Sequence, residues 1–131
     1  MLIGWDQWIL PRLLTCFIGI FYLMLWIQVT VFHMRGKFHK WQMWIPVIAL
    51  PILGLTAILL SIWPTNVLGW IQTFLAGLVI VAGLYGGYLH INAIKHRTGG
   101  FRMENLMTGP PFILPFAIAA LGFINLLLIW Y

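Results

Sequence analysis

Two histidines are the side chains in this sequence best suited to holding a redox cofactor. His33 follows the first apolar stretch of the chain, and His90 lies near the end of the third. Histidines on facing helices of a bundle can ligate haem iron, and the rings of Tyr85 and Tyr88 could line a pocket for haem b or a quinone. The competing interpretation is that His90 only hydrogen-bonds a neighbouring carbonyl or a lipid headgroup at the membrane interface. Both hypotheses stay open at the level of the sequence.

A second group of polar side chains follows His90 along the chain. Its members are His96, Arg97, Arg102, Glu104 and Asn105. Glu104 is surrounded in the sequence by cations, so we expect it to be ionised and to pair with Arg97, Arg102 or a residue of the first basic loop. These residue types could serve lipid-modifying catalysis, but no Ser-His-Asp order or phosphate-binding loop accompanies them. We therefore predict no catalytic residue here.

The histidines do not form a recognisable metal motif. His33 and His39 are not separated by a helical i to i+4 spacing, and neither cysteine nor carboxylate lies beside them. A protein zinc site usually needs three or four such ligands at suitable spacing. We predict no metal site.

The composition shows what kind of protein must position these residues. Of the 131 residues, 63% are hydrophobic and 7% are charged, whereas a soluble domain carries about 25% charged residues. Four crossings of about 20 residues each would use most of this length. We therefore predict one membrane domain over residues 1–131, with no separate soluble domain and no basic soluble surface for nucleic acid.

The apolar stretches and their breaks predict an all-α integral membrane protein, an antiparallel bundle of four transmembrane helices. Trp63-Pro64-Thr65 interrupts a long uncharged region, and Gly109-Pro110-Pro111 precedes the last apolar stretch. Proline and glycine at such places end helices or begin new ones. The expected helices span about residues 13–32, 44–63, 68–97 and 112–131, joined by polar loops at about 33–43 and 98–111.

Three glycines define a packing face on the third expected helix. Gly83 and Gly87 are four residues apart, and Gly86 lies nearly on the same side. Small residues at this spacing let another helix backbone approach closely in lipid. The last helix offers a matching patch of small residues, Ala119 and Gly122 among them, and we expect the two faces to meet.

The cations predict the orientation of the bundle. Six of the seven Lys and Arg residues fall in two clusters that a four-helix topology places at the same side of the membrane. The clusters are Arg35, Lys37 and Lys40, and Lys95, Arg97 and Arg102. The positive-inside rule assigns that side to the cytoplasm, in contact with anionic lipids. Both termini are then outside a bacterial-type plasma membrane, and residues 1–12, with Trp5 and Trp8, are expected along the outer interface.

Three functions fit these features. The first is a non-catalytic subunit or accessory protein of a membrane complex, with other membrane subunits or a second copy as partners, because the spans lack charge and one carries a glycine face. The second is the haem- or quinone-binding redox protein described above. The third is a dimeric transporter or channel for a small solute, with Gln28, Thr56 and Asn125 as the only candidates for a polar lining.

Overall fold

The computed structural model describes residues 1–106 and 108–131, and all regular secondary structure within them is helical. The elements are α1 (Leu10–Arg35), a short 3-10 helix η1 (Trp41–Met43), α2 (Trp44–Ile62), α3 (Asn66–Arg97), α4 (Met103–Leu106) and α5 (Ile113–Trp130). Four of them, α1, α2, α3 and α5, are long and apolar enough to cross a membrane. The prediction of four such helices is therefore confirmed.

The ends of these helices follow from local sequence signals. Pro11 lies in the first turn of α1, where no intrahelical donor is lost. Thr65 caps α3, and its Oγ1 accepts a hydrogen bond from the backbone N–H of Leu68 at 3.3 Å. Three basic residues occupy the last turn of α3, as expected at a helix C-terminus. The short helix α4 was not predicted, because four residues are too few to show a period.

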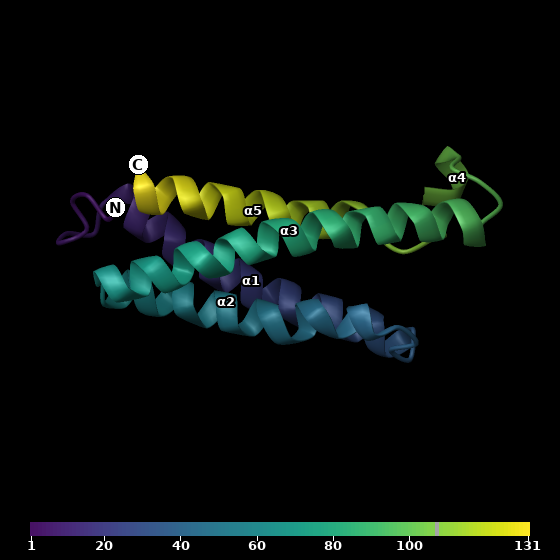
Figure 1. Cartoon of the computed structure of the whole chain (residues 1–131), viewed down its shortest axis with the longest axis horizontal. Helices are drawn as coiled ribbons and strands as arrows, with labels where there is room; N and C mark the ends of the chain where they lie inside the picture. Colours follow the sequence, from purple (N-terminus) through teal and green to yellow (C-terminus); the bar gives the residue numbers. More distant parts are fainter. Residues whose placement is uncertain (107) are drawn as a thin grey trace.

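The four long helices form two closely packed pairs (Figure 1). α1 packs chiefly on α2, and α3 packs chiefly on α5. The two chain ends and the tight α2–α3 turn lie at one end of the molecule, and the α1–α2 and α3–α5 connections lie at the other. We call these the terminal end and the basic end. The pairs lie close at the terminal end and diverge toward the basic end.

Glycine lets the two helices within each pair approach closely. A Cβ built on Gly19 of α1 would lie 2.7 Å from the backbone oxygen of Gly54 in α2. A Cβ on Gly83 of α3 would lie 2.6 Å from the oxygen of Pro115 and 2.8 Å from the Cβ of Ala119 in α5. Such distances are shorter than ordinary van der Waals contact, so only glycine fits. The structure thus places the predicted α3 face against α5, and it contains an equivalent crossing in the α1–α2 pair.

A polar network joins all four long helices in the half of the bundle near the terminal end. Gln72 of α3 donates from Nε2 to Asn125 Oδ1 of α5 at 2.8 Å, and Thr56 of α2 donates to Gln72 Oε1 at 2.5 Å. Asn125 donates in turn to Thr15 Oγ1 of α1 at 3.4 Å. Gln72, Asn125 and Thr15 are fully buried. Since buried amides in an apolar interior require partners, this network fixes the two pairs against each other.

Arg12 provides a second connection at the terminal end. It is 7% exposed, and its guanidinium donates to the backbone oxygens of Ser61 at 2.7 Å and Ile62 at 3.1 Å. These carbonyls end α2, where no intrahelical donor remains and a cation complements the helix dipole. A third bond goes to the oxygen of Trp5 at 3.0 Å, and the guanidinium lies 4.0 Å from the centre of the Trp8 ring.

The N-terminal segment lies partly inside the bundle, unlike the sequence-based expectation of an interfacial position. Trp5 is 2% exposed and packs with Leu60 of α2 and Ile129 of α5. The Leu2 N–H donates to the Ile129 oxygen at 2.8 Å. Trp8, unlike Trp5, stays at the surface and is 53% exposed. The ring of Trp5 is buried, and Arg12 donates a hydrogen bond to the Trp5 oxygen. Both contacts hold this segment against the helix ends.

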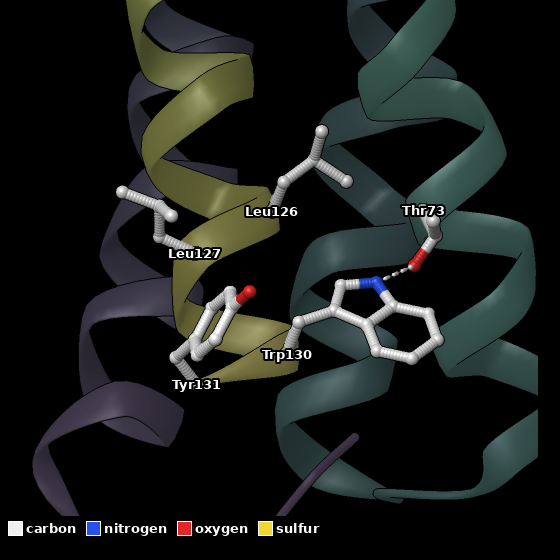
Figure 2. Close-up of a pocket in the computed structure, with 5 residues that line it drawn as sticks. All are labelled: Thr73, Leu126, Leu127, Trp130 and Tyr131. Carbon is white, nitrogen blue, oxygen red and sulfur yellow. Dashed lines mark hydrogen bonds between the residues drawn. The ribbon is translucent and has the colours of Figure 1, made fainter.

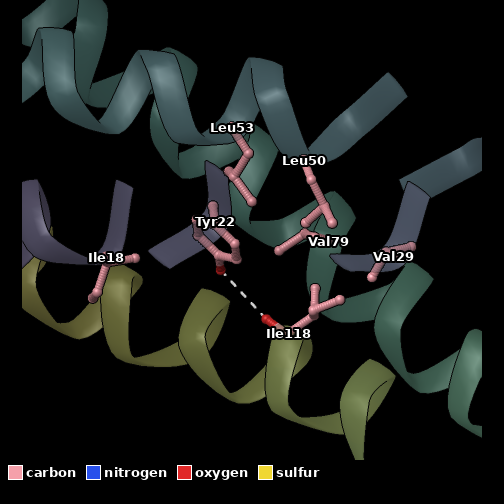
Figure 3. Packing of buried hydrophobic residues seen from close by; sticks show 7 residues of the cluster. All are labelled: Ile18, Tyr22, Val29, Leu50, Leu53, Val79 and Ile118. Atoms are coloured by element: carbon pink, nitrogen blue, oxygen red, sulfur yellow. Dashed lines mark hydrogen bonds between the residues drawn. The ribbon is translucent and has the colours of Figure 1, made fainter. Parts of the chain in front are cut away.

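The central core lies where the pairs begin to diverge (Figure 3). Tyr22 of α1 is fully buried and donates its hydroxyl across the bundle to the Ile118 oxygen of α5 at 3.3 Å. The cluster comprises Ile18, Tyr22, Val29, Leu50, Leu53, Val79 and Ile118. It therefore contains side chains from all four long helices, and the space beyond it opens toward the basic end.

Candidate functional site

A cavity of about 680 Å³ lies between the two helix pairs at the basic end. Its walls come from α1, α2, α3 and α5, and its rim includes residues 108–111. We call it the basic-end cleft. Its size falls within the range of about 300–1,000 Å³ typical of ligand sites.

The cleft contains both histidines that the sequence indicated. His33 reaches it from the end of α1 and His90 from α3. His90 Nδ1 lies 2.9 Å from the Pro111 carbonyl oxygen, so this nitrogen carries the proton and donates. Its Nε2 is then available to a ligand. Histidines that bind metals commonly donate their other ring N–H to a backbone carbonyl in this way.

Three polar atoms on one side of α1 are buried without a hydrogen-bond partner among the described residues. They are Trp26 Nε1, Thr30 Oγ1 and His33 Nδ1. Spacings of four and three residues place them on the same side of the helix, ending at the cleft. Of these three residues only His33 lines the cleft. Because an unpaired buried polar group is costly, its Nδ1 favours an occupant that supplies a hydrogen-bond partner.

Cations and histidines surround the mouth of the cleft. Arg35, Lys40 and Arg97 line it together with His39, and no lining residue is an acid. Arg97 of α3 reaches the α1–α2 connection, where its Nη2 donates to His39 Nε2 at 2.9 Å. His39 Nδ1 donates to the Gly36 oxygen at 2.9 Å, which leaves Nε2 free to accept from Arg97. One contact therefore bridges the two pairs at the rim.

The other predicted polar residues do not gather at this cleft. Tyr88 is 61% exposed and lies outside the lining, whereas Tyr85 lines the cleft. His96, Arg102 and Glu104 are exposed and do not line it either. Of the predicted polar cluster, Arg97 alone lines the cleft.

The loop that carries this cluster is held by its own hydrogen bonds. Asn105 donates from its side chain to the Gly100 oxygen at 2.7 Å. Gly109 packs so tightly on Ile94 that an added Cβ would lie 2.5 Å from Ile94 Cγ1. Among the described residues Glu104 forms no ion pair with Arg97, Arg102 or the first basic loop, and Arg97 instead reaches across the cleft to His39. A bridge between two loops far apart in sequence is not visible from local charge spacing.

Of the two tyrosines that the sequence offered for a pocket lining, only Tyr85 lines the cleft, and the bridge between Arg97 and His39 was not predicted. Tyr85 follows Ala82 by three residues and precedes Leu89 by four, and all three line the cleft. The helical period around the glycines was thus a signal that could have selected Tyr85 over Tyr88. The pairing of Arg97 with His39 had no such signal, since it depends on how far the helix pairs diverge.

A second hollow, of about 490 Å³, lies at the terminal end (Figure 2). Trp130 extends from α5 and donates its indole N–H to Thr73 Oγ1 of α3 at 3.0 Å. The other lining residues are Leu126, Leu127 and Tyr131. No charged group lines this hollow, and the Trp130 indole already has its partner, so it offers less chemistry than the basic-end cleft.

The candidates for a transport lining are also placed away from the cleft. Gln28 is exposed on the outside of α1, and Asn125 and Thr56 belong to the closed network around Gln72. None of them lines the cleft.

Neither family models, nor characterised proteins, nor solved structures show a match to this chain. The geometry therefore carries the functional argument alone.

Proposed function

We propose that the chain is a non-catalytic integral membrane protein, a subunit or accessory protein of a membrane complex, whose basic-end cleft binds a membrane-soluble ligand. One observation carries the proposal. The cleft combines apolar walls between two helix pairs with a rim of cations and histidines, and its volume of about 680 Å³ suits a small amphipathic molecule. The unpaired Nδ1 of His33, which lines the cleft, favours an occupant with hydrogen-bonding groups.

Retention of lipid by the purified protein tests this function. Ala49 of α2 lines the cleft, and its neighbour Ile48 is 60% exposed on the outer side of the same helix. Ala49→Trp should fill the cleft, and Ile48→Trp should add the same bulk outside it. Native mass spectrometry after mild detergent extraction should show bound lipid for the wild type and Ile48→Trp and none for Ala49→Trp. Equal retention by all three proteins would place the lipid on the outer surface and contradict the proposal.

The proposed orientation places the basic end in the cytoplasm and both termini outside a bacterial-type plasma membrane. The clustering of six of seven Lys and Arg residues supports it. On a chain with Cys16 replaced, Lys37→Cys and Phe101→Cys should react with an impermeant thiol reagent only after cells are opened. Thr65→Cys, at the α2–α3 turn, should react in intact cells. Labelling of the first two sites from opposite sides would contradict the topology.

The structure supports one alternative function with a specific observation. His33 and His90 line the same cleft from α1 and α3, and the Pro111 carbonyl fixes His90 with Nε2 available. These two side chains would hold haem b, which would supply one-electron chemistry at this end of the bundle. An absorption spectrum after haem supplementation tests this alternative. A Soret band that His90→Ala removes would support it, and the absence of any Soret band would reject it.

A further inference from the structure

The basic-end cleft carries charge of one sign where it opens. Arg35, Lys40 and Arg97 all line it, and the lining includes no Asp or Glu. Cations near a membrane surface attract anionic lipids, at about fivefold in affinity for each Lys or Arg. The rim therefore selects the charge of the group that the cleft receives.

Arg97 remains able to bind an anion while it bridges the rim. A guanidinium has five N–H donors in a planar fork, and the bond to His39 Nε2 uses one of them. The remaining donors match the paired oxygens of a phosphate or carboxylate better than a lysine ammonium does. Because Arg97 extends from α3 toward the other helix pair, an anion beside it would lie at the mouth between the pairs.

The inner walls of the cleft are apolar and open to the side. Ala82 and Leu89 of α3, Leu114 of α5 and Ala49 of α2 line the cleft and are partly exposed. Tyr85 lines the cleft and is 43% exposed, so an apolar chain could leave the cleft beside α3 toward the surrounding lipid. A small inorganic anion would leave these walls without a partner, whereas an amphiphile would cover them.

We infer that the ligand of the basic-end cleft is an anionic phospholipid, with its headgroup phosphate at Arg97 and the cationic rim and an acyl chain between the helix pairs. This inference rests on the proposed function and adds the headgroup charge that the cleft selects. It also places headgroup or ester oxygens near His33, whose buried Nδ1 has no hydrogen-bond partner among the described residues.

Lipid titration of the delipidated protein tests the headgroup. Native mass spectrometry should compare phosphatidylglycerol with phosphatidylcholine of the same acyl chains, and both with inorganic phosphate. We expect phosphatidylglycerol to bind at least about tenfold more tightly than phosphatidylcholine, with a preference that falls as salt rises. Inorganic phosphate should neither bind measurably nor displace the lipid.

Two matched variants identify the residue that selects the charge. Arg97→Gln should weaken phosphatidylglycerol binding by about fivefold and phosphatidylcholine binding by less, because the choline ammonium of phosphatidylcholine offsets its phosphate charge. Arg102→Gln removes the same charge from an exposed residue that does not line the cleft and should have no effect. Thermal unfolding of each variant in the same detergent shows whether its fold is intact. His39→Gln tests the contact between Arg97 and His39 separately, because it leaves the charge of Arg97 in place.

The outcomes separate this inference from the proposed function. Equal binding of both phospholipids, lost together in Ala49→Trp, would overturn the anionic headgroup and keep a ligand cleft. Equal effects of Arg97→Gln and Arg102→Gln would overturn the assignment to the rim. Displacement of the lipid by inorganic phosphate would show a simple anion site. Binding that Ala49→Trp leaves unchanged would contradict the cleft itself.

Discussion

Replacing Gly83 by alanine tests the close packing that defines the α3–α5 pair. A methyl group at this position would lie 2.6 Å from the Pro115 oxygen and 2.8 Å from the Ala119 Cβ. Ordinary contacts between carbon atoms lie at about 3.5–4.0 Å, and neither neighbour can rotate away. Gly77, six residues earlier on the same helix, is a matched control, because nothing lies within 4 Å of a Cβ built there.

The two substitutions should change the free energy of unfolding by different amounts. Gly to Ala in a helix gains up to about 1 kcal/mol from backbone entropy, and this gain applies at both positions. Overpacking at Gly83 costs about 1–3 kcal/mol in addition. We therefore expect Gly77→Ala to be neutral or stabilising and Gly83→Ala to have a free energy of unfolding lower than that of Gly77→Ala by about 1–3 kcal/mol.

Reversible unfolding in mixed micelles with increasing sodium dodecyl sulfate measures this difference. Circular dichroism reports the loss of helix, and the protein carries eight tryptophans whose fluorescence gives a second signal. Equal unfolding free energies for the two variants would refute the reasoning, because they would mean that α3 and α5 do not approach closely at Gly83.

Three further sets of substitutions probe the polar contacts between helices, by the same unfolding titration. Arg12→Leu should lower the free energy of unfolding by about 2–3 kcal/mol, because hydrogen bonds of a charged group are lost, and Arg12→Lys should restore only part, since an ammonium lacks the planar fork. Asn125→Leu and Gln72→Leu should each cost about 0.6–1.7 kcal/mol, and the double variant should cost less than their sum, because both remove the same bond. Strict additivity would mean that these amides are not coupled. Trp130→Phe should lower the free energy of unfolding by about 0.6 kcal/mol, because the hydrogen bond to Thr73 is lost. An unchanged free energy would mean that this bond does not stabilise the protein.

The sequence was sufficient to predict the four long helices, because each is encoded by an uninterrupted apolar length and by local end signals. Pro64 and Thr65 mark the break before α3, and the cations at Lys95 and Arg97 mark its end. The observed bounds of α3, Asn66–Arg97, differ from the predicted range only at the start. Local chemistry decides such bounds, so a single sequence contains the information.

The contacts between helices were harder to predict from the sequence. The glycines of α3 indicated a packing face, but the crossing of Gly19 with Gly54 was not predicted, because a single glycine on each helix gives no repeated spacing. Gln72 was likewise not singled out, since one amide in an apolar helix does not identify its partner. These contacts join residues far apart in the chain, and their pairing depends on the helix rotation and depth.

The candidate site was predicted in part, for the same physical reason. His33 and His90 were selected from residue type and expected depth, and both line the basic-end cleft. Tyr85 and Tyr88 were both candidates for the lining, and the helical period turns Tyr88 outward and brings Tyr85 to the cleft. The cleft itself arises because the helix pairs diverge, and divergence has no signature in the composition of any one helix.

Thiol reactivity along the bundle tests the central claim, that two packed helix pairs enclose a cleft at the basic end. On a chain with Cys16 replaced, Ala49→Cys and Ala93→Cys lie in the cleft lining, whereas Ala57→Cys and Ala76→Cys lie at positions with no exposed surface. In detergent without phospholipid, a water-soluble maleimide should modify the first two variants and leave the other two protected until the protein is unfolded. Equal protection at all four positions would show that the helix pairs are closed, and equal reactivity would show that they are not packed as described.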